Sequence, residues 1–128
     1  MNLGQTFKKE ERIFLQKEID FLFKEGVSFI SYPLRVIYVE RKPLSGADIS
    51  ILISVSKRKF KQAVKRNRLK RLIRESYRIS KKPLCELLKE RESGLLVAFL
   101  FVGKELNPHK EIETAVTKAL NILEERLQ

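Results

Sequence analysis

The most chemically distinctive part of the chain is a basic segment at residues 57–82. It holds thirteen of the twenty-seven Lys and Arg residues and a single acidic residue, Glu75. Its net charge is therefore +12, and because the whole chain carries a formal charge of +11, the remaining residues sum to −1. Positive charge concentrated in this way on an otherwise balanced chain is typical of a site that binds a polyanion, with RNA or DNA as the first candidates.

Guanidinium and amide groups give this segment its binding chemistry. Five arginines between positions 66 and 78 can each donate paired hydrogen bonds to phosphate oxygens, and Asn67 offers a donor and an acceptor to a sugar or a base edge. The alternative is an ordinary solvated helix face, but such a face normally carries acidic residues at i+4. Repulsion between Arg74 and both Lys70 and Arg71 costs free energy that a bound polyanion would relieve.

The sequence shows no arrangement suited to hydrolysis or to metal binding. Cys85 and His109 are the only cysteine and the only histidine, which excludes an internal disulfide and a Cys/His zinc cluster. There is also no carboxylate cluster, His pair or nucleophile constellation. We therefore expect no catalytic residue, no metal ligand and no cofactor held by this chain.

Length and composition indicate one folded domain over residues 1–128. The chain is 43% hydrophobic with eight Phe, which is too apolar for a disordered basic tail. The first nine residues lack the apolar run of a signal peptide, and no stretch approaches a membrane span. We expect a cytoplasmic protein without membrane contact, because the apolar face of the basic segment is needed for the core rather than for a bilayer.

A helix over residues 60–80 is predicted to carry the basic side chains, since this stretch contains no Gly or Pro. Its apolar side holds Leu69, Leu72, Ile73, Ser76 and Tyr77. Its polar side holds Asn67, Lys70, Arg71, Arg74 and Arg78. Lys65 and Arg66 project toward the apolar side, so we expect them to lie past the end of the core contact and to reach around the sheet edge.

Two strands are predicted before this helix and one helix before the strands. Apolar residues at helical spacing indicate a helix over residues 11–24 that stops at Gly26. Residues 33–40 and 49–56 have strand character and are expected to pair as a hairpin. In the second strand, aliphatic residues at odd positions alternate with Ser50, Leu52, Ser54 and Ser56. The serine-bearing face is expected to stay open.

Three further elements follow the basic helix. A short helix begins after Pro83 and stops at Gly94, and a continuous apolar run over residues 95–102 predicts a strand covered on both faces. Asn107 and Pro108 are expected to cap a last helix. Its predicted buried side consists of Ile112, Ala115, Val116, Ala119, Leu120, Leu123 and Leu127.

Residues 66–75, Arg-Asn-Arg-Leu-Lys-Arg-Leu-Ile-Arg-Glu, follow closely on Ile-Ser-Val-Ser-Lys at residues 53–57. This combination closely resembles the signature of the protein subunit of bacterial ribonuclease P. Residues 22–26, 33–38 and 95–101 resemble the end of that family's first helix, its first long strand and its last strand. The resemblance covers about residues 7–125.

The resemblance implies a ribonucleoprotein enzyme that removes the 5′ leader from precursor tRNA. The RNA subunit with its Mg²⁺ ions would perform the cleavage and the protein would assist. The implied partners are ribonuclease P RNA and precursor tRNA, with no obligate protein partner. The implied contacts to the RNA subunit are Arg66, Asn67, Arg68, Lys70, Arg71, Arg74, Arg78 and Lys57.

The family holds the single-stranded leader in a cleft between its sheet and its first helix. Carried over to this chain, the leader-binding residues would be Phe23, Tyr38, Ser54, Ser56 and Lys65. Aromatic rings there would stack on unpaired bases of any sequence; the alternative for Phe23 and Tyr38 is ordinary core packing. The family often has a second aromatic residue where this chain has Ile19, so leader stacking is weaker here or Phe21 or Phe14 substitutes.

The resemblance also implies the fold class, an α/β (α+β) two-layer sandwich with a small mixed sheet packed by helices. It further implies a left-handed β-α-β crossover, against the usual right-handed rule. Two other functions stay open. A ribosomal or other structural RNA-binding protein would use the same helix without a leader cleft. A DNA-binding protein would place the helix in a major groove, but groove-reading modules dimerise or pair two helices, and neither pattern is present.

Overall fold

The computed structural model describes residues 16–42, 49–103 and 109–128. Apart from one additional strand, the helices and strands follow one another in the order that the sequence predicts. Their order is α1 (Gln16–Glu25), β1 (Val27–Ser31), β2 (Leu34–Arg41), β3 (Ile49–Val55), α2 (Ala63–Ser80), α3 (Lys82–Arg91), β4 (Gly94–Phe101) and α4 (His109–Leu127). The predicted caps at Asn107 and Pro108 and the first part of the predicted helix over residues 11–24 lie outside the described residues. The fold class, a small mixed sheet packed by helices, is confirmed.

The sheet has four strands in the order β1-β2-β4-β3. β2 pairs antiparallel with β1 and with β4, whereas β3 and β4 run parallel. β4 therefore lies inside the sheet with a neighbour on each side, and helices cover both of its faces. Its continuous apolar sequence fits this position, since a strand buried on both faces needs no polar alternation. The prediction of a doubly covered strand is confirmed.

The predicted hairpin between the strands at residues 33–40 and 49–56 is wrong. β4 lies between β2 and β3, so these two strands do not touch as neighbours. The hairpin partner of β2 is β1, a short strand that the sequence analysis missed. β1 is a five-residue edge strand in which only Ser31 is fully buried, so it offers too short an alternation to be recognised in the sequence.

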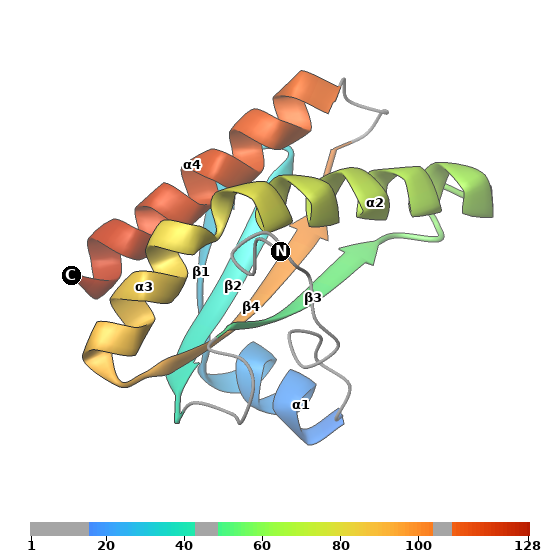
Figure 1. Ribbon diagram of the computed structural model, residues 1–128. Helices are drawn as coiled ribbons and strands as arrows, with labels where there is room; N and C mark the ends of the chain where they lie inside the picture. Colours follow the sequence, from blue (N-terminus) through green and yellow to red (C-terminus); the bar gives the residue numbers. More distant parts are fainter. Residues whose placement is uncertain (1–15, 43–48, 104–108) are drawn as a thin grey trace.

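The connection from β3 through α2 and α3 to β4 crosses over left-handed. In Figure 1, β3 and β4 both point to the upper right, α2 passes in front of them, and β4 lies on the upper-left side of β3. A right-handed connection would place β4 on the other side of β3. The crossover that the family resemblance implies is therefore present.

The main core lies between the sheet and helices α2, α3 and α4. All the α4 positions that the sequence assigns to the buried side are buried. In α2, which begins at Ala63 rather than at position 60, Leu69, Ile73 and Tyr77 are buried and Leu72 is half-buried at the border of the core. These contacts turn the opposite, basic side of α2 toward solvent.

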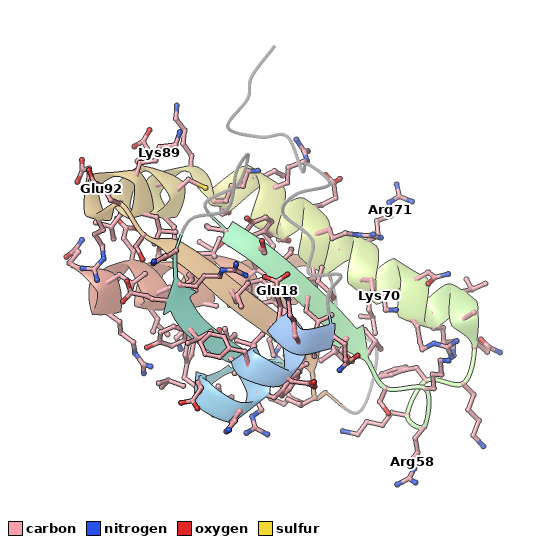
Figure 2. The ribbon with its side chains drawn as sticks, turned by 90° about the horizontal axis from the view of Figure 1, so that it is seen from below. Glu18, Arg58, Lys70, Arg71, Lys89 and Glu92 are labelled. Carbon is pink, nitrogen blue, oxygen red and sulfur yellow. The ribbon has the colours of Figure 1, made fainter. Side chains whose placement is uncertain are left out.

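A smaller hydrophobic cluster packs α1 against the other face of the sheet. Figure 2 is seen from this side, and α1 lies in front of the strands. Leu22 of α1 contacts Ile37, Leu96 and Ala98 in this cluster. An ion pair between Glu18 and Arg41 ties the same helix to β2.

α1 ends at Gly26, as predicted. The Gly26 amide donates to the Leu22 carbonyl over 2.8 Å. A Cβ at position 26 would lie 2.3 Å from that carbonyl oxygen and 2.7 Å from Cγ2 of Ile37. Only glycine allows the chain to turn this close to the sheet.

Candidate nucleic-acid interface

The outward side of α2 carries a row of basic side chains. Asn67, Arg68 and Arg71 are exposed, and Lys70 and Arg74 are half-buried along their stems. The charged groups of Arg68, Lys70, Arg71 and Arg74 have no hydrogen-bond or ion-pair partner among the described residues. Unpaired guanidinium groups on a rigid helix can fork onto phosphate oxygens without first breaking an internal contact. The predicted orientation of this face is confirmed.

Arg78 differs from the other arginines of this row. Its Nη2 lies 2.9 Å from Oε2 of Glu75, one turn away, in an ion pair. Glu75 is the single acid of the basic segment. The positive charge available for an anion therefore decreases toward the C-terminal end of α2 and is concentrated in its N-terminal half.

Basic residues continue from α2 into the segment that joins it to β3. Lys57, Arg58, Lys59 and Lys61 are exposed in this segment. In Figure 2, Arg58 and Arg71 both lie toward the right of the view, Arg58 at the bottom and Arg71 at the top, while Lys89 of α3 and Glu92, just after that helix, lie at the left. The basic surface thus covers one end of the fold, and Lys57, a predicted RNA contact, belongs to it.

Arg66 lies past the end of the core contact, as the wheel predicts, and its guanidinium reaches the segment that follows the edge strand β3. Its Nη1 donates to the Phe60 carbonyl over 2.7 Å and to the Lys61 carbonyl over 2.9 Å. Lys65, beside it, is exposed in the first turn of α2. The two residues therefore differ: Lys65 is free to meet a ligand, whereas Arg66 holds the chain that precedes its own helix.

Tyr38 does not lie on the face of the sheet that α1 borders. It is directly opposite Val27 and Val97 in the ladders, and its ring packs edge-on against Phe29, 6.0 Å between centroids, beside the main core. The placement of Tyr38 in a cleft under α1 is wrong, because side chains alternate along β2 and Ile37 takes the position toward α1.

The serine-bearing side of β3 is open only at its C-terminal end. Ser50 is buried, with 4% of its surface exposed, and Leu52 packs against the small α1 cluster. Ser54 is exposed, and Ser56 lies just beyond the strand. The expectation of an open face is therefore correct for Ser54 and wrong for Ser50.

A row of four residues crosses the sheet at this open end. Ile30 pairs with Arg35, Arg35 with Leu100, and Leu100 with Ser54. Ile30 is 58% exposed, and Arg35, also exposed, has no partner among the described side chains. Arg35 was not among the predicted site residues, although it is the one charged residue within the otherwise apolar and aromatic stretch from Leu34 to Val39.

Phe23 stands on α1, the helix that packs on the same face of the sheet, with 48% of its surface exposed. An exposed phenyl ring can stack on an unpaired base. The structure therefore separates the predicted leader-binding residues. Phe23 and Ser54 belong to the α1 side of the sheet, Ser56 to the connection into α2, Lys65 to the first turn of α2, and Tyr38 to the opposite side.

Metal-binding and membrane-crossing features are lacking in the parts of the chain that the structure covers. No three His, Cys, Asp or Glu side chains within residues 16–42, 49–103 and 109–128 come together as metal ligands. Across the same ranges, every helix is too short or too polar to cross a bilayer.

A sequence model of the Ribonuclease P family matches residues 7–124. The chain belongs to the ribonuclease P protein family. Its function is that of the protein component of ribonuclease P, an endoribonuclease complex that matures tRNA, and its partner is RNA. This membership decides against a generic ribosomal or DNA-binding protein.

Individual members of the family are similar to this chain over most of its length, in sequence or in structure. The ribonuclease P protein component of Porphyromonas gingivalis is 45% identical over 112 residues, covering 88% of this chain and 82% of the relative. The solved structure of the Staphylococcus aureus ribonuclease P protein has a TM-score of 0.67 at 24% identity and covers 88% of this chain and 94% of that one. The Thermotoga maritima protein has a TM-score of 0.60 at 26% identity, over 90% of this chain and 96% of its own. This chain therefore has the fold of both solved structures.

Proposed function

We propose that this chain binds ribonuclease P RNA through the basic face of α2 and binds the 5′ leader of precursor tRNA on the α1 side of its sheet. The single observation that carries the first part is the row of unpaired cations on α2, Arg68, Lys70, Arg71 and Arg74. RNA phosphates would offset the mutual repulsion of these side chains.

The proposed path of the leader follows the row from Ile30 to Ser54. Ile30 offers exposed apolar surface, Arg35 offers an unpaired guanidinium in the middle of the sheet, and Phe23 offers a ring from the bordering helix. Stacking and phosphate contacts of this kind bind single strands without demanding a sequence. Arg35 thus takes the central place that the sequence analysis gave to Tyr38.

The cleavage chemistry is proposed to reside in the RNA subunit and its Mg²⁺ ions. The described side chains offer no cluster of ligands for a divalent cation, so the protein's own contribution would be to bind and orient the two RNAs. The proposed compartment is the cytoplasm, where the complex would meet its precursor tRNA substrate.

Reconstitution with the RNA subunit tests this proposal. Precursor tRNA with a leader of several nucleotides and mature tRNA without one are bound to the RNA alone and to the RNA with protein. We expect the protein to tighten binding of the leader-bearing substrate only and to stimulate its Mg²⁺-dependent cleavage, and we expect the protein alone to cleave nothing. Equal tightening of both tRNAs would refute the leader path, and cleavage by the protein alone would refute the division of labour.

A further inference from the structure

The segment between β3 and α2, residues 56–62, is a folded loop and is called the basic loop here. The Ser56 hydroxyl accepts hydrogen bonds from the backbone amides of Arg58 and Lys59, over 3.2 and 3.4 Å. The Ser56 carbonyl accepts from the Phe60 amide over 3.0 Å. One serine therefore closes the turn from both its side chain and its backbone.

Two side chains of the basic loop tie it to the end of β4. The Phe60 ring is buried and meets the Phe101 ring edge-on, 5.5 Å between centroids. The Lys59 ammonium donates to the Val102 carbonyl over 3.4 Å. These contacts hold the base of the loop against the sheet and leave Lys57, Arg58 and Lys61 exposed.

Arg66 supplies the third tether, from the α2 side. Because its Nη1 donates to two successive carbonyls of the basic loop, those of Phe60 and Lys61 at 2.7 and 2.9 Å, it fixes the orientation of the loop relative to the helix. The loop is thus held at Ser56, at Phe60 and at Arg66 before any ligand binds.

We propose that the basic loop is a preformed binding surface for RNA phosphates, in which Lys57, Arg58 and Lys61 are the contacts and Ser56 and Arg66 are positioning residues. The inference rests on the proposed function and reassigns Arg66 and Ser56, which the family resemblance would place among the direct contacts. A surface that is already ordered loses less conformational entropy on binding, so its contacts give more affinity.

The basic loop lies between the two regions that are proposed to bind RNA. The loop begins two residues after Ser54, the last residue of the row across the open end of the sheet, and precedes the cationic face of α2. It therefore joins the two proposed RNA-binding regions into one continuous surface. Its ligand is the phosphodiester backbone of RNA, and the assay below distinguishes the RNA subunit from the leader as its source.

Hydrogen exchange on the free protein tests the positioning role. In Arg66→Ala, the Phe60 amide should exchange at least about tenfold faster, because local opening governs exchange. Amides in the middle of α2, such as that of Ile73, should keep their rates. Arg68→Ala removes the same charge two positions away and should leave the Phe60 amide unchanged. An unaltered Phe60 amide in Arg66→Ala would overturn the positioning role.

Double-mutant cycles of RNA-binding affinity then test whether Arg66 and Ser56 contribute to binding by positioning the basic loop. The background is the triple variant Lys57→Gln, Arg58→Gln, Lys61→Gln. In the unaltered loop, Arg66→Ala should weaken RNA binding by about three- to tenfold, and so should Ser56→Ala, which changes no charge. In the triple background, each of the two changes should weaken RNA binding by less than about twofold. Arg66→Ala combined with Arg71→Ala, which lies outside the loop, should show additive losses.

Each cycle is run on two complexes, the protein with the RNA subunit and the assembled holoenzyme with leader-bearing precursor tRNA. The complex in which the coupling appears identifies the RNA that the basic loop contacts. If Arg66→Ala and Ser56→Ala weaken RNA binding as much in the triple background as in the unaltered loop, on both complexes, then Arg66 and Ser56 are direct ligands and the inference is overturned. A triple variant that binds both RNAs like the wild type would also overturn it, without touching the α2 face, which Arg71→Ala reports separately.

Discussion

Arg126 and Tyr38 meet on the face of the sheet that α4 covers. The Arg126 Nη1 donates to the Tyr38 hydroxyl over 3.2 Å, and its guanidinium carbon lies 5.8 Å from the Tyr38 ring centroid and 4.9 Å from that of Phe29. This stacked cation joins the last turn of α4 to strands β1 and β2. The contact gives Tyr38 a structural role and removes it from the proposed leader path.

Tyr38→Ala should therefore lower stability without a leader-specific effect. The loss of the half-buried ring and of its contacts to Phe29 and Arg126 should cost about 1–3 kcal/mol of unfolding free energy. Tyr38→Phe, which removes only the hydroxyl, should cost about 0.5–1.5 kcal/mol. Chemical denaturation measures both. A selective loss of affinity for leader-bearing precursor tRNA, with mature tRNA unaffected, would contradict this role.

Arg35→Gln should weaken binding of leader-bearing precursor tRNA by the holoenzyme while leaving mature tRNA unaffected. The guanidinium has no partner to lose within the described structure, so the free protein should melt as the wild type does. The expected loss is about 0.5–1.5 kcal/mol, with a salt slope smaller by about 0.7 if the contact is to a single-stranded phosphate. Lys89→Gln removes the same charge at the far end of α3 and serves as the matched control. Equal losses in both variants would point to net charge rather than to a leader contact.

The double change Arg71→Ala, Arg74→Ala should weaken binding to the RNA subunit and leave the fold intact. Each phosphate contact removed should reduce the slope of log K against log salt by about 0.7–0.9. Arg78→Ala should have a smaller effect, because Glu75 already pairs with this guanidinium. Filter binding across a salt series gives the three slopes. An unchanged slope in the double variant would place the RNA on another surface.

Ile73→Ala and Leu72→Ala, neighbours on α2, should differ in stability. Ile73 is fully buried, so its truncation should leave a cavity costing about 2–5 kcal/mol. Leu72 is half-buried at the border of the core, and its truncation should cost about 1 kcal/mol, since water can fill part of the space. Thermal melting of the two free proteins compares them. A larger loss for Leu72→Ala would mean that α2 is rotated about its axis relative to this description.

Helical periodicity predicted most of the fold, and strand alternation was less informative. The buried side of α4 could be read completely, because its apolar residues recur at one spacing. In β2, Val36, Ile37, Tyr38 and Val39 are all apolar or aromatic, so no alternation shows which of them faces α1. The register with β4 decides the matter, and it assigns Ile37 to that face. An error of one position in such a strand moves a residue to the other side of the sheet.

The pairing of distant strands and the contacts of the basic loop could not be predicted from the sequence, for a different reason. Proximity along the chain favoured a hairpin of β2 with β3, whereas the apolar run of β4 requires the inner position and separates them. The wheel correctly placed Arg66 past the core, but the carbonyls that it binds belong to an aperiodic loop. No pattern in the sequence identifies such acceptors.

The inner position of β4 also sets the order in which the molecule can assemble. β1 and β2 can meet as soon as both are synthesised, but β3 has no partner in the sheet until residues 94–101 have left the ribosome. Until then the basic helix α2 lacks the finished surface on which its apolar side packs. Non-local parallel pairing of this kind is slow. We therefore expect both proposed RNA-binding regions to become native late and together, when β4 inserts between β2 and β3.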